Sequence, residues 1–267
     1  MTIIKKTANI LPTLSVQSPI LEVAVAIKNL NKTFNVREKA AMTIRTRALA
    51  YLRGQRITQK RVHALQNLNL TIDKGEFFGI IGRNGSGKST LLHLLMGAMK
   101  PDKGSVIETK GKLLRLAQGM NFEPELTARD NIYLMASILG LTFKKIGSIF
   151  HEIIAFAEIE NFVDIPVKTY SNGMLSKLKF AIATYAEADI LLMDEFFVGV
   201  GDLNFKEKSE KVFRERLVKG RTIIHVSHSL ESIVKHCDRV LLLDRGVPLA
   251  IGKPEEIVAQ YEALMQA

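Results

Sequence analysis

The chain has 267 residues, 47% of them hydrophobic and 24% charged, and this balance supports a substantial buried core and excludes an intrinsically disordered protein. Its longest apolar runs fall far short of the roughly 18 to 20 residues that a membrane-spanning helix requires, so we expect no transmembrane segment. Residues 1–20 lack the continuous apolar core of a signal peptide, which favours a cytoplasmic location. The single cysteine, Cys237, excludes an internal disulfide and a multi-cysteine metal site, and its place before an apolar run predicts a buried thiol.

The formal net charge of +10 is unevenly distributed along the chain. Residues 36–62 contain eight Lys and Arg residues against one acid, and they separate two predicted strands at 23–27 and 65–72. Apolar spacing within residues 40–52 is compatible with an amphipathic helix. A basic block of this kind favours contact with an anionic partner, and the alternative is a solvated excursion that has no partner.

A predicted strand, a glycine-rich loop and a predicted helix follow. Residues 77–81 form an apolar run bounded by glycines, as in a buried strand, and residues 89–99 have helical apolar spacing. The segment between them, 82–89, reads Gly-Arg-Asn-Gly-Ser-Gly-Lys-Ser and fits the phosphate-loop pattern G-x-x-x-x-G-K-S. Backbone N–H groups of such a loop converge on phosphate oxygens, the lysine neutralises the outer phosphates, and the last serine offers Mg²⁺ a hydroxyl ligand. The predicted phosphate-binding residues are Gly82, Asn84, Gly85, Ser86, Gly87, Lys88, Ser89 and Thr90.

The next part of the chain is predominantly helical. After a predicted short strand at 113–116, a helical pattern extends from residue 126 to about 188. Residues that favour helix N-termini begin its three predicted helices, namely Thr127 with Asp130, Thr142, and Ser171. Short β-branched and aliphatic runs then return at 190–193, 222–226 and 240–243, separated by helical segments. This alternation predicts a parallel sheet wound with helices.

Two adjacent acids, Asp194 and Glu195, follow the predicted strand at 190–193. The carboxyl end of such a strand is the edge at which open α/β sheets bind ligands. We therefore predict that Asp194 orients Mg²⁺ and that Glu195 polarises the water that attacks the γ-phosphoryl group of ATP.

Two further motifs complete a recognisable set. The sequence Tyr-Ser-Asn-Gly-Met at 170–174 precedes the Asp194 strand, and His228 lies just beyond the strand at 222–226. In this order, the motifs resemble those of ATP-binding-cassette (ABC) proteins over roughly residues 23–261, although the common family signature is Ser-Gly-Gly-Gln. The resemblance implies an α/β fold with a P-loop NTPase core of mixed sheet, an inserted helical subdomain and an N-terminal antiparallel β subdomain.

The same resemblance implies the domain organisation. Residues 21–267 would form a single ABC ATPase domain, preceded by an extension at 1–20. The basic insertion would occupy 36–62, and the helical subdomain would occupy about 126–188.

The resemblance also assigns individual roles. Ser171 and Gly173 would bind the ATP held by a second copy of the chain, which implies a homodimer. Gln118 would sense Mg²⁺ or the attacking water, His228 would join Glu195 and Gln118 in catalysis, and Asp202 would lie at the dimer contact.

Phe34 matches the position of the family's adenine-stacking aromatic residue. Because the basic insertion follows it directly, His63 is the alternative.

The sequence is most similar to the ATPase subunits of bacterial polysaccharide exporters, which move O-antigen, teichoic acid or capsule chains. The stretches that carry this similarity are residues 116–127, 166–174 and 198–202. It implies a peripheral subunit on the cytoplasmic face of the bacterial plasma membrane, two copies of an integral membrane permease of the ABC-2 type, and a lipid-linked glycan as the indirect substrate. The basic insertion would then meet anionic lipid head groups or the pyrophosphate of the glycan carrier.

Other functions remain as alternatives. A basic chain with a pI near 9.6 also suits a soluble ABC ATPase that acts on nucleic acid. Against it, the sequence lacks a second cassette, zinc-site cysteines and aromatic residues interleaved in the basic block, so we expect no nucleic-acid partner. An ABC subunit that exports a different substrate is a further alternative. A non-catalytic module is disfavoured because both Lys88 and Glu195 are present.

Overall fold

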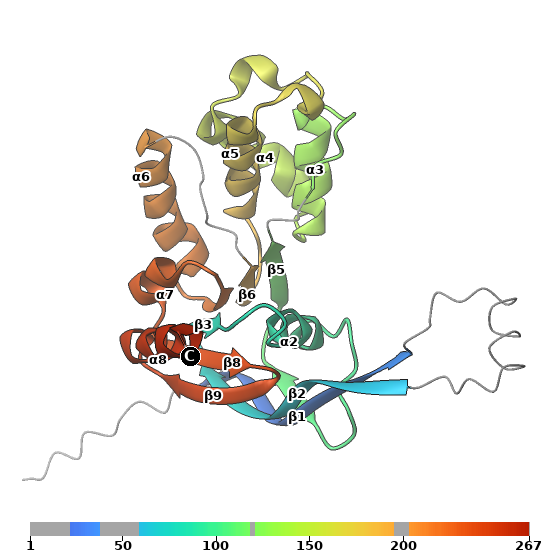
Figure 1. The fold of residues 1–267 in the computed structure, drawn as a ribbon. Coiled ribbons are helices and arrows are strands. Elements are labelled where there is room, and N and C mark those ends of the chain that lie inside the picture. The colour runs from blue at the N-terminus through green and yellow to red at the C-terminus, as the bar shows by residue number, and fades with distance from the viewer. Residues whose placement is uncertain (1–21, 38–58, 118–120, 195–202, 267) are drawn as a thin grey trace, which may run out of the picture.

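The computed structural model describes residues 22–37, 59–117, 121–194 and 203–266 (Figure 1). The described residues form two sheets, one of three strands in the order β2-β1-β4 and one of six in the order β5-β6-β7-β3-β8-β9. The helix predicted within residues 40–52 lies outside the described residues, as do Gln118, Glu195 and Asp202.

The three-stranded sheet is built on a long antiparallel ribbon of β1 (Val23–Arg37) and β2 (Gln59–Asp73), joined by β4 (Val106–Thr109). Both ribbon strands are much longer than the segments predicted at 23–27 and 65–72, and their paired ends reach into the basic segment at 36–37 and 59–62. The ribbon therefore extends away from the body of the protein (Figure 1). The short strand β4 was not predicted, and its residues are mostly exposed.

A repeated Asn-Leu-Asn sequence shapes the middle of this ribbon. Asn29 and Asn67 both have a left-handed backbone with φ of 48°, and the strand register shifts beside each of them. The Asn29 N–H donates to Asn69 Oδ1 at 2.8 Å, and the Asn67 N–H donates to Asn31 Oδ1 at 2.9 Å. An asparagine side chain of each strand thus stabilises the irregular backbone of the other strand. The leucines between the asparagines, Leu30 and Leu68, pair across the strands and are both fully buried.

The six-stranded sheet carries the predicted α/β core. Its strands are β3 (Phe77–Ile81), β5 (Leu113–Ala117), β6 (Ile190–Asp194), β7 (Thr222–Val226), β8 (Arg239–Asp244) and β9 (Val247–Gly252). The first five run parallel, and β9, which was not predicted, pairs antiparallel with β8. The sheet is therefore mixed, and the parallel strands direct their carboxyl ends to one edge.

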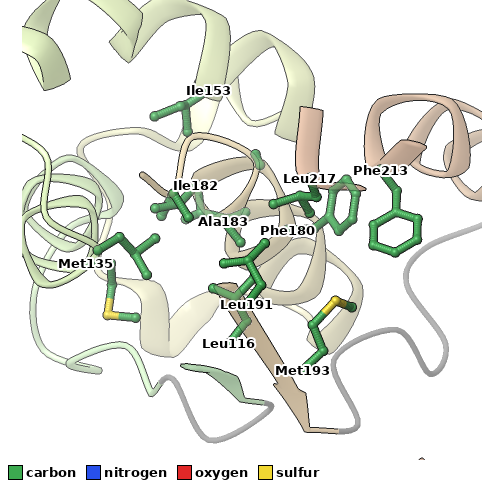
Figure 2. Packing of buried hydrophobic residues seen from close by; sticks show 14 of the residues in the cluster. Leu116, Met135, Ile153, Phe180, Ile182, Ala183, Leu191, Met193, Phe213 and Leu217 are labelled. Atoms are coloured by element: carbon green, nitrogen blue, oxygen red, sulfur yellow. The ribbon is translucent and has the colours of Figure 1, made fainter. Parts of the chain in front are cut away.

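Strand alternation divides the core between the two faces of this sheet. On one face, Ile190 and Leu192 pack with α2 (Lys88–Leu95) and the three-stranded sheet. On the other face, Leu191 and Met193 pack beneath the helices, with Ile182, Phe180 and Leu217 close by (Figure 2).

The helical group comprises α3 (Ala128–Ile138), α4 (Phe143–Ala157) and α5 (Asn172–Ala183), with short 3-10 turns η1 (Glu160–Phe162) and η2 (Val167–Thr169) between α4 and α5. All three predicted N-caps are confirmed, because Thr127, Thr142 and Ser171 each accept a hydrogen bond from a backbone N–H in the first turn. The last helix ends at Ala183, so the helical pattern predicted to about residue 188 is too long by a few residues.

The C-terminal part contains α6 (Leu203–Val212), the π-helical η3 (Phe213–Val218), α7 (Leu230–His236) and α8 (Pro254–Gln266). Helix α6 packs on the helical group, where Phe205 contacts Phe156 of α4 and Phe180 of α5. Cys237 follows α7 and is buried, which confirms the predicted buried thiol, and burial raises its pKa to about 12. Within the described part of the chain, no helix is long and apolar enough to cross a membrane.

Candidate nucleotide-binding site

The glycine loop connects β3 to α2, as predicted. A Cβ atom added to Gly82 would lie 2.1 Å from the carbonyl oxygen of Leu243, and one added to Gly87 would lie 2.5 Å from that of Ala64. Gly87 also has a φ of 110°, which other residues rarely adopt. By contrast, a Cβ at Gly85 would meet nothing within 4 Å, so the loop is crowded on its inner side and open at its tip. A glycine loop with open space at its tip suits an anion such as a phosphate group.

Lys88 follows the last glycine of the loop and begins α2. Its side chain is largely buried, and Nζ donates to the carbonyl oxygens of Gly82 at 2.7 Å and Arg83 at 3.0 Å. The loop's own backbone thus positions the ammonium group. No acidic residue lies in the first turn of α2, so the helix N-terminus and Lys88 together favour an anion.

The hydroxyl-bearing residues of the loop occupy different environments. Ser86 is buried, and its Oγ has no hydrogen-bond partner among the described residues, which leaves a polar atom of the loop available for a ligand. Ser89 is exposed in the first turn of α2, and Thr90 beside it is half-buried. A solvent-facing serine hydroxyl at this position fits the oxygen-rich coordination that Mg²⁺ prefers.

Asp194 ends β6 at the same edge of the sheet. In register it lies level with Val226 of β7, which is level with Ile80 of β3. Two strand spacings, or about 10 Å, therefore separate the Asp194 backbone from the strand that leads into the loop. Its carboxylate accepts a hydrogen bond from Arg115 in β5, with 2.5 Å between Nη2 and Oδ2. Arg115 was not predicted, although a lone arginine inside the apolar run Leu-Leu-Arg-Leu-Ala was a visible signal.

His228 lies in the turn between β7 and α7, and its side chain is exposed. The turn is fixed by its neighbours, because Ser229 caps α7 and the Ser229 N–H donates to Ser227 Oγ at 3.0 Å. Since β7 lies between β6 and β3, the structure places His228 at the edge that also bears Asp194 and the phosphate loop.

A second histidine, His225 within β7, has a different environment and was not predicted. It is buried on the helical side of the sheet, where its ring packs edge-on against Phe77 and its Nε2 lies 3.2 Å from Ser232 Oγ. Burial lowers its pKa to about 4, and the neighbouring His236 acts in the same direction. His225 is therefore a neutral core residue at physiological pH.

The two candidates for stacking on adenine, Phe34 and His63, lie on opposite faces of the β1–β2 ribbon. Leu30, Lys32 and Phe34 alternate onto one face of β1, which is the face that Leu30 buries in the core. Phe34 is half-buried there, with the Lys32 ammonium 5.4 Å from its ring centroid. His63 pairs with Thr33 and so lies on the opposite face of the ribbon, where its Nδ1 is 3.2 Å from Thr33 Oγ1.

Ser171 and Gly173 lie apart from the phosphate loop of the same chain. Ser171 caps α5, with its Oγ accepting from the Met174 N–H at 3.2 Å, and Gly173 is exposed in the first turn. The 12 residues of α5 span about 18 Å and lead from Ser171 toward the sheet. In Figure 1, α5 stands within the helical group, whereas α2 lies beside the β1–β2 ribbon.

These features define a class of protein. A glycine loop joins a parallel strand to a helix, a carboxylate strand lies two positions away, and a helical group is inserted between them, which is the arrangement of a P-loop nucleotide-binding cassette.

Comparison with known proteins identifies the family. The family model described as "ABC transporter" matches residues 65–198. The O-antigen export system ATP-binding protein RfbB of Klebsiella pneumoniae is 41% identical over 82% of this chain and 87% of its own length. The chain therefore belongs to the ABC transporter family, which confirms an ATP-binding, ATP-hydrolysing chain.

Other relatives are longer than this chain. The protein of the same name in Myxococcus xanthus is 40% identical over 89% of this chain, and the teichoic acids export ATP-binding protein TagH of Lactococcus lactis is 38% identical over 92%. The chain spans 55% and 52% of the lengths of these two relatives.

A solved structure supports the fold class. An ATP-binding cassette in a dimeric, post-hydrolysis state bound to ADP and Pi has a TM-score of 0.64 to this chain at 23% identity, covering 86% of this chain and 98% of that one. The predicted α/β cassette fold is thus confirmed.

Proposed function

We propose that this chain is the ATP-hydrolysing subunit that drives export of a lipid-linked polysaccharide through a partner membrane permease of the ABC-2 type. The observation that carries the proposal is the phosphate loop with its buried, backbone-held Lys88, in a chain about 40% identical to proteins named for O-antigen and teichoic acid export. The subunit would act at the cytoplasmic face of the plasma membrane, with two permease copies as its partners.

Mg²⁺ would be held on the outer phosphates of ATP by Ser89, Asp194 and Gln118. When bound, Mg²⁺ would supply positive charge that neutralises the phosphates. Lys88 binds the phosphate oxygens, Glu195 accepts the proton of the attacking water, and His228 contacts the γ-phosphate. The exposed Ser89, and Asp194 at the same sheet edge, support this assignment.

Hydrolysis would require two copies of the chain. Ser171 and Gly173 begin α5, exposed and remote from the phosphate loop of their own chain, so they are available to an ATP molecule held by a second copy. A serine hydroxyl and a helix N-terminus together form an anion site. Asp202 would lie at this homodimer contact, and Phe34 would stack on adenine through the ring face that Lys32 does not cover.

The experiment that tests this function combines ATPase and export assays. The wild-type gene should restore surface display of the glycan in a strain that lacks it, and the purified protein should hydrolyse ATP only with Mg²⁺. Lys88→Ala should abolish both activities. Lys74→Ala is the matched control, because Lys74 is exposed and pairs only with Glu22 among the described residues. ATPase activity stimulated by DNA, with salt-sensitive binding and no effect on glycan display, would instead support the nucleic-acid alternative.

A further inference from the structure

Arg115 has a position that its strand does not explain. It is the one charged residue of β5, whose other members are Leu113, Leu114, Leu116 and Ala117. Strand β5 lies at the edge of the six-stranded sheet and pairs only with β6 among the described strands. A guanidinium group on such a strand needs an anionic partner, and Arg115 finds it in Asp194 of β6.

Strand alternation places this pair on the nucleotide side of the sheet. Leu113 packs into the core that contains α2, whereas Leu114 and Leu116 pack beneath the helical group. Arg115 shares the face of Leu113, because side chains two residues apart in a strand point the same way. Asp194 shares the face of Leu192, which is the register partner of Arg115. The guanidinium group therefore reaches Asp194 on the face that carries the phosphate loop.

The contact is made on the carboxylate that the proposed function assigns to Mg²⁺. Nη2 of Arg115 lies 2.5 Å from Oδ2 of Asp194, and each side chain is only about a quarter exposed, at 26% and 25%. Screening by solvent is thus partial. A guanidinium group and a divalent cation compete for the same carboxylate, since each neutralises its charge.

The remainder of the guanidinium group is not fixed in the same way. The Nε atom of Arg115 is buried, and within the described part of the chain nothing accepts a hydrogen bond from it. Among the described residues, the ion pair with Asp194 holds the head group. A buried N–H without an acceptor makes the arrangement less stable than a fully bonded one.

We propose that Arg115 is a latch that occupies Asp194 while the site holds no Mg²⁺–nucleotide and is displaced when Mg²⁺–ATP binds. The proposal rests on the proposed function and adds a regulatory residue to the same site. In the nucleotide-free subunit, Arg115 neutralises a carboxylate that adjoins the acid Glu195 in sequence. Its displacement makes binding of the Mg²⁺ complex weaker than it would be at a vacant carboxylate, and it does not alter binding of ATP without the metal.

A Mg²⁺ titration tests the latch. The purified full-length protein is mixed with a fluorescent non-hydrolysable ATP analogue, and binding is followed as free Mg²⁺ is raised at constant ionic strength. Removing the charge with Arg115→Gln should lower the half-saturating Mg²⁺ concentration about fivefold, or about 1 kcal/mol at 1.4 kcal/mol per tenfold change. This is the upper end for a partly exposed ion pair. Arg115→Lys, which keeps the charge but loses the planar fork, should give an intermediate value.

Two controls test whether the effect comes from the ion pair between Arg115 and Asp194. Arg129→Gln removes a different arginine–aspartate ion pair, in which Arg129 of the helical group donates two hydrogen bonds to Asp164, and it should leave the Mg²⁺ titration unchanged. In the Asp194→Asn background, Arg115→Gln should have no further effect, since its partner carboxylate is absent. Electron paramagnetic resonance of Mn²⁺ in place of Mg²⁺ provides a readout of metal binding that does not depend on fluorescence.

The outcomes separate failure of the latch from failure of the proposed function. If the wild type binds the analogue no better than Lys88→Ala, or without any effect of Mg²⁺, the proposed function is wrong. If wild-type binding depends on both Lys88 and Mg²⁺ but the Arg115 variants titrate like the wild type, only the latch is wrong. A higher half-saturating concentration in Arg115→Gln would also overturn it, because Arg115 would then orient Asp194 for the metal. Should Arg115→Gln fail to fold by circular dichroism, Arg115→Lys decides the matter.

Discussion

The buried histidine His225 predicts a specific loss of stability in mild acid. Burial lowers its pKa from 6.5 to about 4 in the folded chain, whereas the unfolded chain keeps the ordinary value. Both states are neutral above pH 6.5, so the folded state then bears no penalty. As the pH falls from about 6.5 to 4, the unfolded state takes up the proton first, and stability decreases. These two pKa values give a loss of about 2 kcal/mol between pH 7.5 and pH 5.

Urea unfolding at pH 7.5, 6 and 5 measures this loss. Other groups also titrate in this range, including the half-buried His236, whose pKa burial lowers in the same direction. The comparison is therefore with His225→Gln, which is neutral throughout and can still bond Ser232. The wild type should lose about 2 kcal/mol more than the variant over this pH interval. An equal loss of unfolding free energy in the two proteins would refute the burial argument. A smaller loss in the wild type than in His225→Gln would mean that the folded chain raises the pKa of His225 instead of lowering it.

Three further predictions test other parts of the chain. Gly82→Ala should abolish nucleotide binding measured by isothermal titration calorimetry, because the new Cβ would lie 2.1 Å from the Leu243 carbonyl oxygen. A dissociation constant within threefold of the wild-type value would contradict this loop geometry. Asn29→Ala should lower the unfolding free energy by about 1 kcal/mol because of its left-handed backbone, whereas Asn29→Gly should cost less; equal losses in urea unfolding would refute the reasoning. Neutralising Arg45, Arg47, Arg53 and Arg56 together should impair glycan display while sparing the basal ATPase activity of the purified subunit; undiminished display would exclude an anionic target of the basic insertion.

The elements that sequence predicted best are those set by local rules. Residues 77–81 form β3 as predicted, because a buried parallel strand is a continuous apolar run bounded by glycines. Thr127, Thr142 and Ser171 begin helices because N-capping depends on a side chain and the next three residues.

Features that depend on distant parts of the chain were missed. Strand β9 alternates exposed and half-buried residues, and its sequence gives no sign that β8 will pair with it antiparallel. The ribbon of β1 and β2 is long because the two strands stabilise each other, with asparagines bonding across 36 and 40 residues of sequence. Such pairings are visible only once the register is known.

In the candidate site, too, the local motif was predictable and the contact between distant residues was not. The phosphate loop could be found from its own eight residues, and the sheet order then brought Asp194 and His228 to the same edge. Arg115 acquires significance only through its contact with Asp194, a residue 79 positions later. Gln118, Glu195 and Asp202 lie outside the described residues and stay predictions.

We propose above all that two copies of this chain close around ATP at a shared site. Sedimentation of Glu195→Gln by analytical ultracentrifugation, with and without Mg²⁺–ATP, tests it most directly. The variant should bind ATP, fail to hydrolyse it, and sediment as a stable dimer only when ATP is present. Adding Ser171→Ala or Lys88→Ala to this variant should prevent the dimer. A Glu195→Gln protein that binds ATP but stays monomeric, or one that turns over ATP at the wild-type rate, would contradict the account.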